Sequence, residues 1–355
     1  MNAIDNLITS AINDGIFPGA AISIGNKNGE IFRNRYGSRQ LEPEVLPVEE
    51  NTLYDLASLT KIISTTMVAL SLVEKGKLQL SDTLGKFFQC PSDKQGITIH
   101  QIMTHTSGLP AHAPLYDLCK TPTDVYHTIL EMPLLAQPGK SVVYSCLGFI
   151  LLGKICEMAG NTTLDKLAQE IVFAPLGLKT MAYNPCNTSY NFATTEYCNV
   201  LGKWLGGTVH DENARFMGGV SGNAGLFACI SDCAKVATMY ANKGSGIITQ
   251  ALFEQAVQNH TPNCDEARGL GFAVKGEHIV SCGQNFAEGS YGHTGFTGTS
   301  IWVDAATSQY VVFLTNRVHP TRENNKLIAF RRVLHDLCVK EYAKKINKED
   351  VHERP

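Results

Sequence analysis

The segment "DLASLTKIIST", Asp55 to Thr65, places a serine hydroxyl and a lysine amine three positions apart in an apolar run. Residues three apart on a helix share a face, so the amine of Lys61 can reach the hydroxyl of Ser58. Serine is a good nucleophile only when a neighbouring base takes its proton, and lysine can be that base when burial lowers its pKa. The start of a helix adds free N–H groups that can hold an oxyanion. The pair therefore indicates covalent catalysis through Ser58, with Lys61 as the base.

Two further segments carry groups that such chemistry uses. Tyr144 stands in "GKSVVYSCLGFILLG", just before an apolar run of helical length. His293, Thr294 and Gly295 lead into a strand-like run in "YGHTGFTGTSIWVD". With Ser58 and Lys61, these segments resemble the SxxK, YxN and KTG or HTG elements of the serine β-lactamase and penicillin-binding-protein superfamily, in its branch of class C β-lactamases, DD-peptidases and related esterases. The segments "FPGAAISI", "MTHTSGLP", "GGVSGNAGLF" and "FLTNRVHP" are similar to the same branch, so the resemblance covers nearly the whole chain.

The resemblance implies a role for each matched residue. Ser58 would be the acylated nucleophile, and Lys61 and Tyr144 would share a proton network in which Tyr144 protonates the leaving group. The backbone N–H groups of Ser58 and Phe296 would form the oxyanion hole. The implied substrate-binding residues are Cys146, His293, Thr294, Gly295 and Phe296. The resemblance implies no metal and no organic cofactor.

Two positions depart from the pattern of that superfamily. Cys146 stands where asparagine is usual, and a thiol is a weak donor that cannot imitate a carboxamide. His293 stands where dedicated β-lactamases have lysine, and a neutral histidine attracts a carboxylate less strongly near pH 7. Both departures favour simple esters over β-lactams as substrates.

Other polar segments have simpler interpretations. Ser221-Gly222-Asn223 imitates an SxN element but lies in a glycine-rich run, and we interpret it as loop structure. His105 and Ser107 are expected to cap helix ends and brace the site. The run "HDENA" at His210 does not place ligands on one helix face as HExxH does, so no metal site is predicted there.

Composition excludes several classes of function. The net charge of the 355-residue chain is -3, so it has no broad basic surface for nucleic acid. No run of about 18 apolar residues predicts a membrane span, and no basic and apolar leader opens the chain. As the sequence stands, it is expected to be cytoplasmic; if a signal peptide has been removed, it would be periplasmic or extracellular. The 11 cysteines include no CxxC pair, which favours buried thiols over a disulfide framework or a zinc ribbon.

The distribution of hydrophobic patterns predicts an α+β fold. Strand-like runs occur on either side of Asn28-Gly29 and in "LGFAVKG", "HIVSC", "TSIWVD" and "QYVVFLTNR" near the other end. Helices are predicted over Ile4–Asn13, Ser58–Lys75, Ile97–Thr104, Thr123–Glu131, Ser145–Ala159, Thr163–Val172 and Asn324–Lys345. We therefore expect an antiparallel sheet flanked by helices, an α/β sandwich formed by residues 1–79 and 266–355. A mainly helical lobe over 80–265 would be inserted, with the active site between the two.

The sequence leaves open what the site acts on. A small ester, a D-amino-acid amide or peptide and a β-lactam all fit a serine acyl-enzyme as substrates. An α/β-hydrolase would need a GxSxG turn, which the chain lacks. The alternative from another class is a non-catalytic penicillin-binding or sensor-type protein that is acylated without turnover. The expected partner is a small molecule or short peptide, and the oligomeric state is not predicted.

Overall fold

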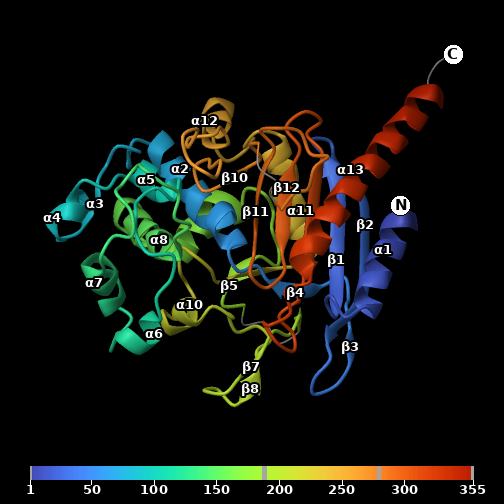
Figure 1. Cartoon of the computed structure of the whole chain (residues 1–355), viewed down its shortest axis with the longest axis horizontal. Coiled ribbons are helices and arrows are strands. Elements are labelled where there is room, and N and C mark those ends of the chain that lie inside the picture. Colours follow the sequence, from blue (N-terminus) through green and yellow to red (C-terminus); the bar gives the residue numbers. More distant parts are fainter. Residues whose placement is uncertain (1, 186–189, 278–280, 353–355) are drawn as a thin grey trace.

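A seven-stranded antiparallel sheet forms the half of the molecule drawn on the right of Figure 1. The computed structural model describes residues 2–185, 190–277 and 281–352. From one edge to the other, the strands are β10 (Ala273–Val274), β11 (Tyr291–Thr294), β12 (Ser300–Val303), β13 (Tyr310–Thr315), β1 (Gly19–Asn26), β2 (Gly29–Gln40) and β3 (Leu46–Pro47). Every pairing in it is antiparallel. The expected α+β fold, with a sheet built from both ends of the chain, is confirmed.

The pairing of β1 with β13 joins the two ends of the chain, with Ala20 opposite Thr315 and Gly25 opposite Tyr310. On its other side β1 forms a hairpin with β2, and the pair Asn26 and Gly29 closes the turn. Gly29 has a φ of 123°, a conformation that L side chains rarely adopt. The Asn-Gly hairpin predicted from the sequence is therefore present.

Helices cover both faces of this sheet. Alternate residues of β1 and β13, such as Ile22 and Phe313, pack in one hydrophobic cluster with α1 (Asn2–Asn13) and α13 (Leu327–His352). The residues between them, such as Ala21 and Val312, belong to the other cluster, which includes α11 (Ile230–Ala241). A strand buried on both faces explains why β1 and β13 read as nearly continuous apolar runs.

The other half of the molecule is built around two helices that are apolar on nearly all sides. These are the segment formed by the π-helix η1 (Lys61–Thr66) with α2 (Met67–Glu74), and α8 (Cys146–Gly160). They pack against each other and against α9 (Leu164–Ala168) and the π-helix η2 (Gln169–Phe173). The remaining helices are α3 (Leu84–Phe87), α4 (Ser92–Gln95), α5 (Ile99–Met103), α6 (Leu115–Leu118), α7 (Asp124–Glu131), α10 (Glu212–Phe216) and α12 (Gln250–Ala256).

Outside the large sheet, the structure contains short strands that the sequence did not predict. A four-stranded sheet has the order β5 (Ala182–Tyr183), β9 (Leu226–Ala228), β4 (Thr52–Asp55) and β6 (Asn191–Phe192), and β7 (Tyr197–Cys198) pairs with β8 (Lys203–Trp204). Strands of two to four residues are too short for a period-two pattern to stand out. The predicted strand "HIVSC" falls partly on 278–280, outside the described residues, and Ser281 and Cys282 are in a turn.

Helix α11 lies within 80–265 in sequence, yet it packs against β1, β12 and β13 of the large sheet. The division of the chain at residues 79 and 265 stays a prediction. Across residues 2–185, 190–277 and 281–352, no helix is both long and apolar enough to span a membrane.

Candidate active site

Ser58 lies in a tight turn between β4 and η1, and the side chain of Asp55 holds that turn. Asp55 is buried; its Oδ1 accepts a hydrogen bond from the N–H of Ala57 at 2.9 Å, and its Oδ2 accepts one from the N–H of His210 at 2.7 Å. Ala57 has a φ of 46°, in the left-handed region that non-glycine residues seldom occupy. The two hydrogen bonds therefore stabilise a strained turn that presents Ser58 to the cavity described below.

The amine of Lys61 lies one turn after Ser58, fully buried. Its Nζ donates to the Oγ of Ser58 at 2.9 Å, to the Sγ of Cys146 at 3.4 Å and to the carbonyl of Asn223 at 3.0 Å. An ammonium has three N–H donors, and each finds an acceptor here. The predicted contact between the amine and the hydroxyl is present, although Ser58 lies in the turn before the helix and not on the helix itself.

The charge of Lys61 differs from the expectation. Burial lowers its pKa, but the groups around it, Cys146 and Tyr144 foremost, raise it, and the net shift of the pKa is upward. The expectation that burial leaves Lys61 neutral was wrong for the resting site, because burial also brings acceptors to all three N–H groups of the ammonium. Lys61 can therefore act as a base only after its ammonium group has lost a proton.

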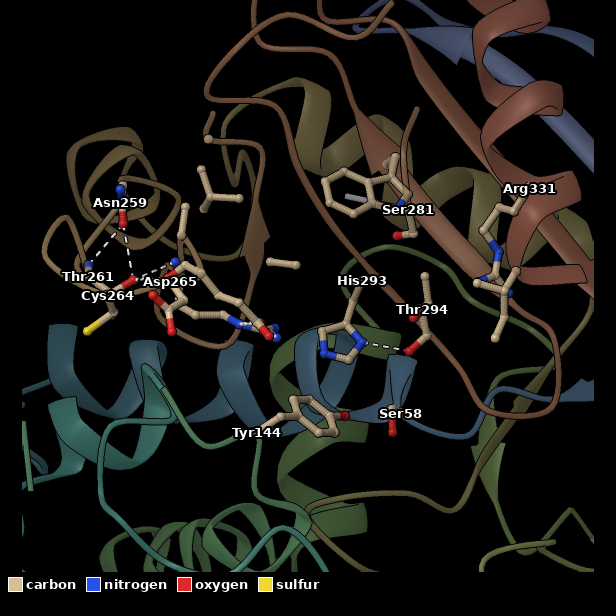
Figure 2. Close-up of a pocket in the computed structure, with 18 of the residues that line it drawn as sticks. Ser58, Tyr144, Asn259, Thr261, Cys264, Asp265, Ser281, His293, Thr294 and Arg331 are labelled. Carbon is tan, nitrogen blue, oxygen red and sulfur yellow. Dashed lines mark hydrogen bonds and ion pairs between the residues drawn. The ribbon is translucent and has the colours of Figure 1, made fainter. Parts of the chain in front are cut away.

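Tyr144 lies on the other side of the hydroxyl, and Figure 2 shows its phenol pointing toward Ser58. Burial raises the pKa of Tyr144, while the charge of Lys61 and hydrogen bonds to Ser58 and Lys61 lower it, with a net upward shift. The Nζ of Lys61 lies 5.2 Å from the centre of the tyrosine ring. Tyr144 is thus a neutral phenol at rest, next to an ammonium and a serine hydroxyl.

The ring of His105 packs against the ring of Tyr144. Its ring centre lies 4.6 Å from that of Tyr144, and its Nδ1 accepts a hydrogen bond from the N–H of Ser145 at 3.0 Å. Ser145 in turn caps α8, since its Oγ accepts from the N–H of Gly148 at 3.0 Å. The expected bracing role of His105 is confirmed by these contacts.

The turn after β11 is attached to the segment that precedes Ser58. Thr297 donates through its Oγ1 to the carbonyl of Asp55 at 2.6 Å, and Thr299 donates to that of Leu56 at 3.0 Å. Gly295 lies so close that a Cβ there would be 2.5 Å from the carbonyl oxygen of Leu56. The backbone of Phe296 is therefore held beside the turn of Ser58. Within residues 2–185, 190–277 and 281–352, neither the N–H of Ser58 nor that of Phe296 donates a hydrogen bond.

His293 lies on β11 above the ring of Tyr144, with 5.7 Å between ring centres (Figure 2). Its Nδ1 contacts the carbonyl of Thr294 at 2.7 Å, so Nδ1 carries the proton and Nε2 is left as an acceptor. Burial, with the nearby cations Lys61 and Arg268, lowers the pKa of His293 to about 3. The expectation of a neutral histidine at this position is confirmed.

Ser58, Tyr144 and the residues from His293 to Phe296 line one cavity of about 760 Å³. Its walls come from the turn of Ser58, Tyr144 two positions before α8, strand β11, the segment 259–268 and helix α13. Three arginines take part in it: Arg268, Arg317 and Arg331. Arg268 forms an ion pair with Glu266 and lies 5.4 Å above the ring of Tyr144.

Comparison with known proteins identifies the family. A sequence model of the family described as Beta-lactamase matches residues 4–335. The chain belongs to the Beta-lactamase family. It is 31% identical over 361 residues to a putative D-alanyl-D-alanine carboxypeptidase of Escherichia coli K12, an alignment covering 90% of this chain and 82% of that protein. It is 32% identical over 333 residues to a putative D-alanyl-D-alanine carboxypeptidase of Salmonella enteritidis PT4, covering 83% and 76%.

Solved structures share the fold. EstCE1, a hydrolase with promiscuous acyltransferase activity, aligns with a TM-score of 0.77 at 21% identity, covering 94% of this chain and 98% of that one. The octameric penicillin-binding protein homologue from Pyrococcus abyssi aligns with a TM-score of 0.75 at 22% identity, covering 94% and 77%. These two structures show the shared fold. The family model and the relatives named as carboxypeptidases make the chain a hydrolase of the Beta-lactamase family.

Some residues at the site of this Beta-lactamase family member were not predicted from the sequence. The loop around Ser221 is structural, as expected, since the Oγ of Ser221 donates to the side chain of Asn223 at 2.7 Å. The carbonyl of Asn223 nevertheless binds Lys61, and a backbone acceptor leaves no signal in the sequence. Arg268 and Arg331 were also missed, because an isolated arginine carries no motif.

His210 is a support for the site, through its backbone bond to Asp55 and its side chain. Its Nε2 contacts Glu196 at 2.8 Å, and its ring lies 5.8 Å from that of Phe296. In the part of the chain that the structure describes, no group of three or more histidine, cysteine, aspartate or glutamate side chains could hold a metal ion.

Proposed function

We propose that the protein is a serine hydrolase that forms an acyl-enzyme at Ser58, with a small ester as its preferred substrate. The observation that carries this proposal is the contact of 2.9 Å between the Nζ of Lys61 and the Oγ of Ser58. Tyr144 supports it, because its phenol interacts with both groups. A serine hydroxyl can pass its proton to a neighbouring general base as it attacks.

The proton balance follows from the resting charges. At rest Lys61 is an ammonium and Tyr144 a phenol, so the pair can act as a base only after it has released one proton to water. The pair then takes the proton of the Ser58 hydroxyl while Oγ bonds to the carbonyl carbon of the substrate. Because the two sites are coupled, the proton belongs to the pair rather than to either residue.

The later steps use the same groups. The N–H groups of Ser58 and Phe296 hold the carbonyl oxygen of the substrate as it becomes negative. The pair returns its proton to the leaving oxygen as the bond between that oxygen and the carbonyl carbon breaks. It then takes a proton from water, whose oxygen attacks the acyl-enzyme, and it gives that proton to the Oγ of Ser58 as the bond between Oγ and the carbonyl carbon breaks.

Esters are preferred to amides in this proposal because of Cys146. Its Sγ accepts from Lys61, so its single weak S–H is the only donor it can offer a substrate amide. The second candidate substrate class is a peptide or amide with a terminal D-amino acid, which the names of the carboxypeptidase relatives favour. A β-lactam is the third. The second candidate function is a sensor-type protein that is acylated without turnover.

The test is covalent labelling followed by turnover. We expect a neutral serine-directed phosphonate to add one equivalent to Ser58, located by peptide mass spectrometry, and a p-nitrophenyl ester to be hydrolysed with a steady rate. Ser58→Ala should abolish both while keeping the circular dichroism spectrum. Labelling with a single burst and no steady rate would support the sensor instead. Unchanged ester turnover in Ser58→Ala would overturn the proposed function.

A further inference from the structure

Arg268 is a cation that lies against the ring of Tyr144 and takes no part in the proton steps proposed above. The Cζ of its guanidinium lies 5.4 Å from the centre of the ring, much as the Nζ of Lys61 does at 5.2 Å. A cation at such a distance is attracted to the electrons of an aromatic ring. Tyr144 therefore lies next to two cations, which come from different segments of the chain.

Arg268 belongs to the segment 259–268, which forms one wall of the cavity in Figure 2. The backbone of Arg268 is fixed within that segment. Its N–H donates to the Oγ1 of Thr261 at 2.9 Å, and its carbonyl accepts from the N–H of His260 at 2.7 Å. The side chain forms an ion pair with Glu266, to which its Nε donates at 3.1 Å. A change of this side chain should therefore leave the segment in place.

The ion pair between Arg268 and Glu266 is unequally exposed. The side chain of Arg268 is 11% exposed, whereas that of Glu266 is 57% exposed. Water and salt screen an exposed carboxylate more strongly than a buried guanidinium. The pair therefore leaves a net positive potential on its inner side, where Tyr144 lies.

Two histidines that contact the ring of Tyr144 bring no charge to it. The ring centres of His105 and His293 lie 4.6 and 5.7 Å from that of Tyr144. Burial, with the nearby cations Arg268 and Lys61, lowers the pKa of both histidines, so both are neutral at pH 7. The positive charge next to the ring is therefore that of the lysine and the arginine.

Other ionisable groups act on Lys61 in the opposite direction to Arg268. Cys146, whose Sγ accepts from the Nζ of Lys61, and the carboxylate of Asp211 both raise the pKa of the lysine. Asp265 lines the cavity at an exposed position, where water screens its charge. A guanidinium instead favours the form of a neighbouring pair that has one proton fewer, because like charges repel.

We propose that Arg268 is a positioning residue: it holds the ring of Tyr144 and, through its charge, helps the pair of Lys61 and Tyr144 to release its first proton. The proton goes to water, and no bond to Arg268 forms or breaks. The attraction between guanidinium and ring grows as the phenol becomes a phenolate, because the ring side chain then carries a negative charge. This inference rests on the proposed function and adds a residue that acts on the reaction through Tyr144.

The first experiment measures kcat/KM for a neutral p-nitrophenyl ester against pH in variants of the ion pair. In Arg268→Gln, the profile should move to higher pH by about 0.5 to 1 unit, at the low end for a neighbouring charge, because Glu266 offsets part of it. At a fixed pH on the rising limb, kcat/KM should fall about 2- to 10-fold, since a pair with a higher pKa is deprotonated less often but is then the stronger base. Glu266→Gln should move the profile to lower pH, and Arg268→Lys should stay near the wild type.

The matched control is Arg35→Gln. Arg35 of β2 also pairs with a glutamate, Glu50, at 3.3 Å, and both side chains are about half exposed. Its loss should leave the profile unchanged. Damage to the segment 259–268 would lower kcat/KM in Arg268→Gln and Glu266→Gln alike, so shifts of opposite sign identify an effect of charge.

A titration that needs no turnover separates this inference from the proposed function. With 3,5-difluorotyrosine at position 144, whose phenol is more acidic than that of tyrosine, ¹⁹F NMR follows the ionisation while the protein stays folded. The midpoint should rise in Arg268→Gln and fall in Glu266→Gln. If wild-type protein hydrolyses no ester and Ser58 takes up no phosphonate, but the midpoints move in this way, the proposed function fails and the role of Arg268 stands.

Other outcomes would overturn the role of Arg268, whatever the ester rates. These are a midpoint that stays in place in Arg268→Gln, midpoints that move in the same direction in Arg268→Gln and Glu266→Gln, and an equal shift in Arg35→Gln. Ester profiles that do not follow the midpoints in an active protein would overturn it as well.

Discussion

The Sγ of Cys146 accepts a hydrogen bond from the Nζ of Lys61 at 3.4 Å. The carbonyl of an asparagine side chain would accept this hydrogen bond from Lys61 more strongly than the thiol does. An asparagine would also offer its NH₂ group to the substrate, and the thiol does not replace that donor. The thiol keeps the lysine in place and removes a contact to amide substrates. This relationship leads to the first prediction.

Replacing Cys146 by asparagine should raise kcat/KM for a chromogenic cephalosporin or a peptide amide by about 2- to 13-fold, the value of one neutral hydrogen bond. Turnover of a p-nitrophenyl ester should change little, because a simple ester lacks the amide group that the new side chain would bind. Steady-state kinetics on both proteins make the measurement. If wild-type protein cleaves the cephalosporin as fast as the ester, or if the substitution depresses both, Cys146 is a fitted part of a differently shaped pocket.

Lys61→Ala and Tyr144→Phe should each lower kcat by roughly 10²- to 10⁴-fold, the usual range for groups that transfer protons. The double variant should lose much less than the product of the two, because the coupled pair acts as one base. Single-turnover kinetics with a p-nitrophenyl ester would give the acylation rates, and a thermal melt would check folding. Multiplicative losses would show that the two residues act independently.

The pH profile of kcat/KM should rise with pH, from acid into the alkaline range. The reason is the sign of the two shifts: the pKa values of Lys61 and Tyr144 are both raised, so the reactive form, which has one proton fewer, becomes more abundant at higher pH. His293 adds no inflection above pH 5, since its pKa is about 3. Initial rates in constant-ionic-strength buffers, corrected with Ser58→Ala, test this. A maximum below pH 7 would contradict it.

Asp55→Asn should both destabilise the protein and slow acylation. Both carboxylate oxygens of Asp55 accept backbone N–H groups, and asparagine can accept with only one of its two terminal atoms. Leaving one buried N–H unsatisfied costs about 1–3 kcal/mol of unfolding free energy. Urea unfolding and the rate of phosphonate labelling at Ser58 measure the two effects. The exposed Asp117→Asn is the control, and equal results for the two variants would refute the role of Asp55.

His335 should make the protein less stable in mild acid. It is fully buried on α13, and burial, with the nearby cation Arg331, lowers its pKa from 6.5 to about 3. Below pH 6.5 the unfolded chain takes up a proton at His335 that the folded chain does not, so unfolding becomes easier as the pH falls. Between pH 6 and pH 4, the loss approaches about 1.4 kcal/mol per pH unit for this one group.

The variant His335→Gln has no imidazole to take up this proton in the unfolded chain. Its unfolding free energy should therefore depend less steeply on pH than that of the wild type. Urea unfolding at pH 7, 6 and 5 gives the slopes. His127→Gln, at an exposed position of α7, is the matched control and should run parallel to the wild type. Parallel curves for His335→Gln as well would mean that His335 is not buried in its neutral form.

Much of the fold could be predicted because it is encoded locally. The hairpin of β1 and β2 follows from an Asn-Gly pair between apolar runs, and α8 follows from a long apolar stretch after a serine cap. The short strands β4, β5, β6 and β9 could not be predicted, because a strand of two to four residues is defined by its partners. Their sheet nevertheless matters, since β4 delivers Asp55 and the turn of Ser58.

The sequence by itself determined that the amine of Lys61 can reach the hydroxyl of Ser58, because residues three apart lie close together in one turn of the backbone. Their likeness to a known motif, together with Tyr144 and His293, indicated the rest of the site. Only the tertiary structure decided the charge of Lys61, because its three acceptors include the carbonyl of Asn223, far along the chain. It alone also showed that the buried Nε of Arg331 has no hydrogen-bond partner within the described residues. Folding brings groups from distant segments of the chain around each buried side chain. The pKa of that side chain, and whether its N–H groups find acceptors, depend on all of these groups together.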